Sequence, residues 1–315
     1  MVVTALAVVS GVLVATVELR ARRTFDAPYP VIAASADPAT IADGKYLVYG
    51  PGACAYCHVP KSEWKRLDAG ELLPLTGDHL FPMPLGNLFS ANLTPDPDTG
   101  IGRRTDAELA RVLRYGVLAD GRAAFPLMEF HNLSDEDLIA AISYLRSVAP
   151  ERRPVRDHEW TLIGKAVMAF AIAPKGPDSA PPKMSPARTV SAARGEYLAN
   201  NVASCVGCHT DRSPQDGSFI GPKFAGGMRM DVAADPTKVY VPPNLTPDAT
   251  TGRSGQWSED VFVARFRQGE LVEGTPMPWG AYARMTGDDL RSVYRYLRTL
   301  PPALHETGAA VQPKQ

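Results

Sequence analysis

The chain has 315 residues, which is enough for two domains of ordinary size and their connections. Its formal net charge is −1, with 33 Lys and Arg interspersed among 34 Asp and Glu. This balance excludes a basic nucleic-acid-binding surface and a strongly charged docking tail. The 29 prolines favour loops over long regular elements, and strand-like alternation is scarce, so we expect an all-α protein.

The N-terminal segment, residues 2–17, is almost continuously apolar, and a cluster of three arginines follows it: Arg20, Arg22 and Arg23. About 20 apolar residues cross a bilayer, so residues 1–23 predict a short N-terminal membrane anchor. The alternative is the apolar part of a secretory signal that is cleaved after export. No small-x-small cleavage site follows closely, which favours the anchor, with residues 24–39 as a linker.

All four cysteines lie in two motifs in which a histidine directly follows the second cysteine: Cys54-Ala55-Tyr56-Cys57-His58 and Cys205-Val206-Gly207-Cys208-His209. Two thiols three positions apart on one helical turn can each add to a vinyl group of haem. The next residue then directs its imidazole at the iron. The motifs therefore predict two covalently bound c-type haems, with His58 and His209 as proximal iron ligands.

Three other uses of these cysteines explain the sequence less well. A structural zinc site brings two CxxC pairs together within a few tens of residues, whereas about 150 residues separate them here. Structural disulfides give no reason for a histidine after both pairs. A thioredoxin-like redox pair belongs to a βαβ pattern, which the sequence lacks.

The two halves of the chain form a repeat with an offset of about 151 residues. The segment Gly44-Lys45-Tyr46-Leu47 recurs as Gly195-Glu196-Tyr197-Leu198, and Asn92-Leu93-Thr94-Pro95-Asp96 recurs as Asn244-Leu245-Thr246-Pro247-Asp248. A Thr-Gly pair follows both Asn-Leu-Thr-Pro-Asp segments, as Thr99-Gly100 and Thr251-Gly252. We therefore predict one domain at residues 40–150 and a second at 191–303, followed by a tail at 304–315.

Each half ends with two predicted helices. The first of each pair begins at Thr105 or Ser258, with a Thr105-x-x-Glu108 capping box, and ends near Gly116 or Gly269. The last helix begins at Ser134 or Thr286 and carries one apolar face: Leu138, Ile142 and Leu145, or Leu290, Val293 and Leu297. Pro150 and Pro301 end these helices.

The residues between the halves, 151–190, form a connection with a proline-rich end. Its apolar part, from Trp160 to Pro174, is too short to span a membrane. We expect a helix that packs against a domain or the seam between domains, with a partner-binding segment as the alternative.

Each haem iron needs a sixth ligand or an open position, and a methionine thioether suits electron transfer. Met277 lies between two prolines in the loop before the last helix, and its rival Met285 is opposite Leu133, a packing position. Met128 occupies the corresponding loop of the first half, with His131 and Met83 as alternatives. We predict Met128 and Met277 as distal ligands. The other histidines, His79, His158 and His305, have no repeat counterpart, and we expect them at the surface.

The chain resembles the tandem-domain diheme cytochromes c of bacterial respiratory systems over residues 40–303. The repeated Asn-Leu-Thr-Pro-Asp…Thr-Gly segment is similar to that of cytochrome c subunits of membrane-bound alcohol, aldehyde and sugar-acid dehydrogenases. Those subunits usually carry three haem domains, and this chain carries two motifs. The resemblance implies His/Met ligation of each iron and electron delivery from a catalytic partner toward quinone or a terminal oxidase.

The sequence thus predicts an electron carrier, not an enzyme, at the periplasmic face of a bacterial inner membrane. Its partners would be a dehydrogenase, a quinol-oxidising complex or a terminal oxidase. The chain would contact the membrane through its N-terminal helix. The arginines after that helix conflict with this topology, because the positive-inside rule keeps such a cluster cytoplasmic. Alternatives are a peroxidase-type or thiosulfate-oxidising diheme enzyme and a haem sensor or structural module.

Overall fold

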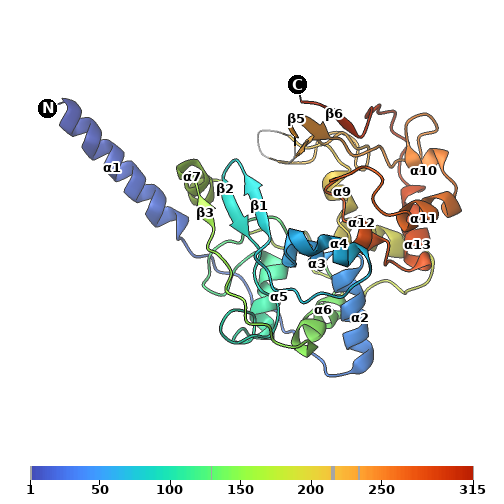
Figure 1. The fold of residues 1–315 in the computed structure, drawn as a ribbon, viewed down its shortest axis with the longest axis horizontal. Helices are drawn as coiled ribbons and strands as arrows, with labels where there is room; N and C mark the ends of the chain where they lie inside the picture. Colours follow the sequence, from blue (N-terminus) through green and yellow to red (C-terminus); the bar gives the residue numbers. More distant parts are fainter. Residues whose placement is uncertain (1, 129, 214–216, 233–234, 315) are drawn as a thin grey trace. The chain divides into compact units, whose positions relative to one another are not determined.

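The computed structural model describes residues 2–128, 130–213, 217–232 and 235–314. Helices joined by long irregular segments dominate, together with a few short strands (Figure 1). The chain divides into two compact units. The first comprises Met1–Lys45, Cys54–Trp64 and Leu73–Lys183, and the second comprises Tyr46–Ala53, Lys65–Leu72 and Met184–Gln315. The predicted domain limits stay predictions.

Two helices begin in the first unit and end in the second, namely α2 (Pro38–Tyr49) and α4 (Trp64–Asp68). The other elements of the first unit are α1 (Val2–Ala21), α3 (Cys54–His58), the 3₁₀ turn η1 (Lys61–Glu63), β1 (Leu80–Met83), β2 (Gly86–Phe89), α5 (Asp106–Tyr115), α6 (Asp135–Ser147), β3 (Glu159–Trp160) and α7 (Leu162–Phe170). Those of the second unit are α8 (Ala192–Tyr197), the π-helical turn η2 (Leu198–Val202), α9 (Cys205–Cys208), β4 (Met230–Val232), β5 (Asp235–Tyr240), α10 (Arg253–Gln256), α11 (Glu259–Arg267), α12 (Trp279–Tyr282), α13 (Gly287–Leu297) and β6 (Val311–Pro313).

The predicted helix caps are confirmed. The Thr105 hydroxyl accepts a hydrogen bond from the Glu108 backbone N–H, and the Glu108 carboxylate accepts one from the Thr105 N–H, which is the predicted capping box. The side chains of Ser134, Ser258 and Thr286 also cap the helices that follow them. Gly116 ends α5 in the left-handed conformation, with φ of 63°, as a C-cap glycine does.

The expectation of an all-α fold is wrong in part, because each unit also contains a small antiparallel sheet. The strand orders are β1-β2-β3 in the first unit and β4-β5-β6 in the second. Strands β1 and β2 form a hairpin in which Met83 pairs with Gly86 across Pro84 and Leu85. Proline and glycine suit such a tight turn, and Gly86 has φ of 138°. The strands are so short that periodicity could not reveal them.

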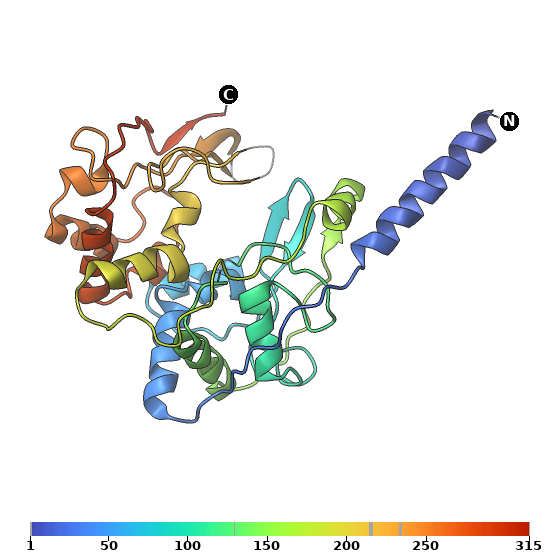
Figure 2. The ribbon, with the colours of Figure 1, turned by 180° about the vertical axis from the view of Figure 1, so that it is seen from behind.

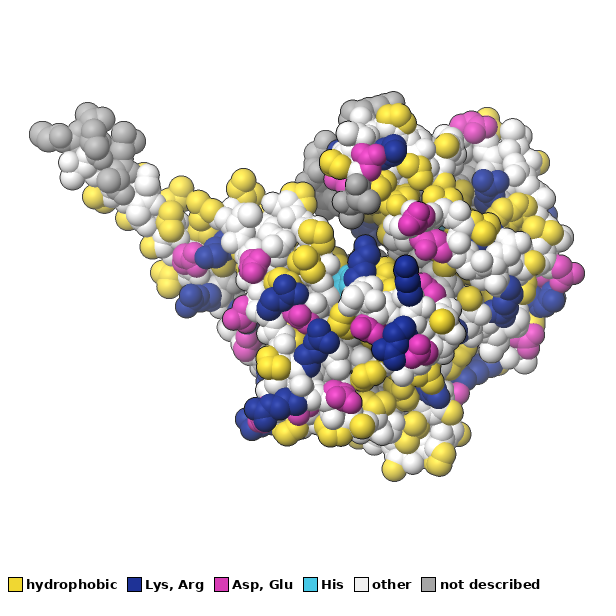
Figure 3. Space-filling model, viewed as in Figure 1, with side chains coloured by type: hydrophobic (Ala, Val, Ile, Leu, Met, Phe, Trp, Pro, Cys, Tyr) yellow, Lys and Arg dark blue, Asp and Glu magenta, His cyan; other side chains and the backbone are white. Residues whose placement is uncertain are grey.

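The N-terminal apolar segment forms α1, whose described apolar side chains are largely exposed, including Val8, Val9, Val12 and Leu13 (Figure 3). Helix α1 contacts α7, the helix predicted in the connection, and Lys165 of α7 forms an ion pair with Glu18. Within the described ranges, we find no helix with both the length and the apolarity that a membrane crossing requires. The structure therefore does not support the expected N-terminal membrane helix.

A glycine stands where the first and last helices of each repeat cross. In the first unit, α6 lies beside α2 (Figure 2), and a methyl group on Gly44 would lie 1.8 Å from the Ala140 carbonyl oxygen. In the second unit, α13 packs against α8, and a methyl group on Gly195 would lie 1.8 Å from the Ser292 carbonyl oxygen. Both helix pairs are thus too close for any side chain, which explains the repeated glycine.

The cores of both units lie next to these crossings. The predicted apolar faces of α6 and α13 are buried, with exposed fractions of at most 8%. The residues concerned are Leu138, Ile142 and Leu145 in α6 and Leu290, Val293 and Leu297 in α13.

We expect Gly195→Ala to lower the free energy of unfolding by about 1–3 kcal/mol, because its methyl group can be accommodated only if α8 and α13 move apart. Gly287→Ala is the matched control, since nothing lies within 4 Å of a methyl group at this position of α13. The control should change the free energy of unfolding by about 0.5 kcal/mol or less. Urea unfolding of both variants measures the difference, and equal stabilities would contradict the close crossing.

Candidate haem-binding sites

Both cysteine motifs occupy a short helix that a left-handed residue precedes. Helix α3 carries the first motif, and α9 carries the second, with His209 as its C-cap residue. Directly before them, Ala53 has φ of 48° and Ser204 has φ of 47°. Residues other than glycine rarely adopt this conformation, and it persists where the surrounding structure imposes it. The same unusual turn therefore places both motifs.

Cys57 and Cys208 are exposed, whereas Cys54 and Cys205 are partly buried. Desolvation raises the pKa of Cys54 and of Cys205 to about 12, and the neighbouring cysteine of each pair adds to this shift. Such thiols stay protonated at neutral pH, unlike the reactive thiolate of a thioredoxin-like pair. In the part of the chain that the structure describes, no group of three or more His, Cys, Asp or Glu could hold a metal ion.

The two motif histidines have the same hydrogen bond. Nδ1 of His58 lies 2.8 Å from the Ala91 carbonyl oxygen, and Nδ1 of His209 lies 2.9 Å from that of Pro243. A carbonyl oxygen can only accept, so Nδ1 carries the proton and donates it. Nε2 of each ring therefore presents a lone pair, which is the form that binds iron.

Burial supports the same protonation state. Both rings are about nine-tenths buried, and desolvation lowers the pKa of His58 and of His209, although the carbonyl hydrogen bond opposes the shift. Each imidazole is therefore neutral at physiological pH. The sequence indicated the histidines but not the residues that orient them, Ala91 and Pro243. A signal was present, because each directly precedes the asparagine of the repeated motif.

The repeated Asn-Leu-Thr-Pro-Asp segment anchors these carbonyl groups. In the second unit, the buried Asn244 side chain donates to the Thr251 hydroxyl (2.9 Å) and the Ala303 carbonyl (2.7 Å), and accepts from the Thr246 N–H (2.9 Å). In the first unit, Asn92 makes the equivalent bonds to Thr99, Glu151 and Thr94. Each asparagine thus ties the loop that carries the histidine's acceptor to the chain just beyond the last helix.

The aspartate that ends this segment closes the turn behind it. Asp248 Oδ1 accepts from the backbone N–H and the hydroxyl of Thr251, at 2.7 and 2.8 Å, and Asp96 binds Thr99 in the same way. These hydrogen bonds lower the pKa of both carboxyl groups. The threonine of each Thr-Gly pair therefore links the asparagine to the aspartate.

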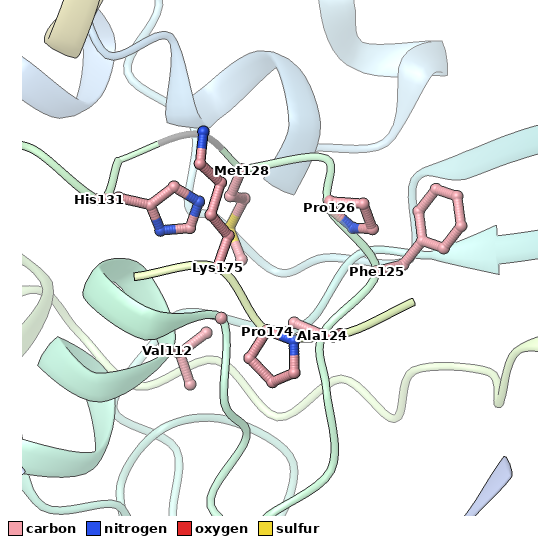
Figure 4. Close-up of a pocket in the computed structure, with 10 residues that line it drawn as sticks. Val112, Ala124, Phe125, Pro126, Met128, His131, Pro174 and Lys175 are labelled. Carbon is pink, nitrogen blue, oxygen red and sulfur yellow. The ribbon is translucent and has the colours of Figure 1, made fainter. Parts of the chain in front are cut away.

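The methionines predicted as distal ligands lie in the loop before the last helix of each repeat. Met277 is half-buried and directly precedes Pro278, the N-cap residue of α12. Met128 lines a small cavity that His131 and Lys175 also line (Figure 4). Met285 is buried, with 3% exposure, and Met83 lies in β1. Assignment of Met128 and Met277 as iron ligands stays a prediction.

The expectation for His79 is wrong, because only 6% of it is exposed. Its ring stacks on Trp64, with centroids 5.1 Å apart, and contacts Phe81 edge-on. Burial lowers the pKa of His79 to about 4, with smaller contributions from nearby Lys61 and His58. The missed signal was the apolar sequence that follows it. His158 is exposed as expected, whereas His305 is half-buried and bonds to the Ala225 carbonyl.

The motif helix, the oriented histidine and the asparagine-anchored loop thus recur in both units, in the pattern of the c-type cytochromes that the chain resembles. No family model matches the chain. The predicted resemblance is confirmed by its relatives, which are cytochrome c subunits of dehydrogenases and a diheme cytochrome c.

One relative is the cytochrome c subunit of a quinone alcohol dehydrogenase from Gluconobacter oxydans, 31% identical over 85% of this chain and 56% of its own length. The gluconate 2-dehydrogenase cytochrome c subunit of Pantoea cypripedii is 27% identical over 84% of this chain and 60% of its own length. A diheme cytochrome c-type protein of Cereibacter sphaeroides is 24% identical over 81% of this chain and 84% of its own length. The chain spans 56–58% of the length of the alcohol dehydrogenase subunits. These dehydrogenase relatives are named as cytochrome subunits, in agreement with the expectation that this chain is not an enzyme.

We expect Asn244→Ala to destabilise the second unit by about 1–3 kcal/mol, because the buried Thr246 N–H loses its acceptor and the Ala303 carbonyl loses its shortest hydrogen bond. Asn92→Ala is the matched change in the first unit. Hydrogen exchange followed by mass spectrometry locates the effect of each variant. Each variant should increase hydrogen exchange in its own unit. An equal increase in both units would contradict the inference that the two loops are anchored separately.

Proposed function

We propose that this chain is a diheme c-type cytochrome that passes electrons within a dehydrogenase complex. The main support is the pair of neutral, oriented imidazoles, because each CxxCH histidine holds Nδ1 on a carbonyl and leaves Nε2 for a metal. A structural or redox use of the cysteines has no need of this arrangement. The relatives are named as cytochrome c subunits, which supports the same conclusion.

Haem c, when bound, supplies the one-electron chemistry. The chain's own residues would hold and tune it. Cys54 and Cys57 would form the thioether links of the first haem, and Cys205 and Cys208 those of the second. His58 and His209 would bind iron from the proximal side, and Met128 and Met277 from the distal side. A thioether as sixth ligand raises the reduction potential and keeps the iron closed to other molecules, which suits electron transfer.

We place this activity at the periplasmic face of a bacterial inner membrane, because c-type haem is attached on that side. The donor we propose is a dehydrogenase subunit, since the names of the relatives connect such cytochromes with dehydrogenases for alcohols, gluconate and fructose. The acceptor would be quinone or a terminal oxidase of the respiratory chain.

Coexpression with a c-type haem attachment system should yield about two haems per chain, measured as the pyridine haemochrome. His209→Ala should keep the second haem, because its two thioether links remain, but should convert that haem alone to high spin. Electron paramagnetic resonance of the oxidised protein measures the spin states. An unchanged spectrum would remove His209 from the ligand set, and a protein without haem would refute the proposed function.

A diheme peroxidase would need one iron open to peroxide, whereas two His/Met haems are closed. We therefore expect the reduced wild-type protein to bind essentially no carbon monoxide, because both sixth positions are filled. Optical titration with carbon monoxide measures this. Binding of about one equivalent per chain would favour the enzyme alternative.

A further inference from the structure

Three side chains that can bind iron converge on one cavity of the first unit. The cavity measures about 30 Å³, and Met128, His131 and Lys175 are among its lining residues. Figure 4 shows the Met128 sulfur and the His131 ring on the same cavity, with the Lys175 side chain running between them. Two of these groups lie in the loop before α6, where the distal ligand of the first haem is expected.

The His131 ring is oriented as the two proximal histidines are. Its Nδ1 lies 3.0 Å from the carbonyl oxygen of Arg114, in the last turn of α5, where carbonyl groups have no partner within the helix. Because the carbonyl accepts, Nδ1 donates this hydrogen bond, and in the neutral ring Nε2 is then the nitrogen with the lone pair. The hydrogen bond alone is not diagnostic, since His305 has one too. The combination with a distal-loop position and a shared cavity is particular to His131.

The second repeat has no such histidine. Ser134 and Thr286 are the equivalent N-cap residues, so the position three residues earlier is His131 in one repeat and Ala283 in the other. Met277 also has a proline on each side, whereas Leu127 precedes Met128 and Glu129 follows it. The methionine of the second loop is therefore held more rigidly, and this loop contains no histidine in the sequence.

Resting on the proposed function, we propose that His131 is a second distal donor for the first haem, which binds the iron when the Met128 thioether is lost. Imidazole is a common iron ligand in proteins, and the hydrogen bond of Nδ1 to Arg114 leaves Nε2 as the donor atom of the neutral ring. Lys175 is disfavoured, because a lysine ammonium has no lone pair until it loses a proton. When its methionine ligand is lost, the first haem thus keeps six ligands, whereas loss of Met277 leaves the second haem with five.

The test compares Met128→Ala with Met277→Ala in the haem-loaded full-length chain. In Met277→Ala, we expect a high-spin second haem and about one equivalent of carbon monoxide bound by the reduced protein. In Met128→Ala, we expect a low-spin first haem with the electron paramagnetic resonance signature of two imidazoles and essentially no carbon monoxide bound. Met128→Leu keeps the packing volume and serves the same purpose if the alanine variant does not fold.

Two double variants identify the replacing ligand. Adding His131→Ala to the Met128 variant should convert the first haem to high spin and restore binding of about one equivalent of carbon monoxide. Adding Lys175→Ala should change neither property. The proposal is overturned if the first haem of the single Met128 variant binds as much carbon monoxide as the second haem of Met277→Ala. It is also overturned if adding Lys175→Ala, rather than His131→Ala, makes the first haem of the Met128 variant high-spin. The haem content of every variant separates this outcome from failure of the proposed function, which would appear as missing haem.

Discussion

The hydrogen bond from the motif histidine to a backbone carbonyl is the interaction on which the rest of each unit depends. It fixes the tautomer and rotation of His58 and His209, because only one ring orientation lets Nδ1 reach Ala91 or Pro243. That carbonyl is placed by the next residue, Asn92 or Asn244. The asparagine in turn bonds to the chain that leaves the last helix, at Glu151 or Ala303. The end of each repeat therefore secures the site near its beginning.

The close crossing of first and last helices complements this anchoring. Gly44 and Gly195 let the backbones of two helices approach until no side chain fits between them. Beyond the crossing, the chain continues directly to the residue that the asparagine holds. The helix crossing, the final turn of the last helix and the loop that contains Asn92 or Asn244 are thus connected in each repeat. The recurrence of this connection at equivalent positions of both repeats indicates that the same structural constraint acts on both.

The surroundings of the two motifs nevertheless differ. The first unit has the buried stack of Trp64 and His79 near its motif, and a distal loop that shares a cavity with Lys175 of the connection. The second has a methionine between two prolines and no imidazole in the distal loop. Because the polarity and hydrogen bonding around a haem set its potential, the two proposed haems are not equivalent.

The sequence by itself determined whatever depends on residues close together along the chain. The cysteine motifs, the capping residues Thr105, Ser134 and Thr286 and the apolar faces of α6 and α13 are local patterns, and the structure reproduces these helices and caps. Periodicity failed for strands of two to six residues, since such short segments contain too few alternations to distinguish them from loops.

Tertiary structure decided which distant groups meet. No local pattern indicates that the Ala91 carbonyl receives the proton of His58, that Asn244 bonds to Ala303, or that His79 lies under Trp64. These partners are 15 to 59 residues apart, so their meeting depends on how helices and loops pack rather than on the order of residues. Hydrogen-bond geometry and burial arise only from that packing. The sequence therefore supplied the ligand-type residues, and the fold supplied their orientation.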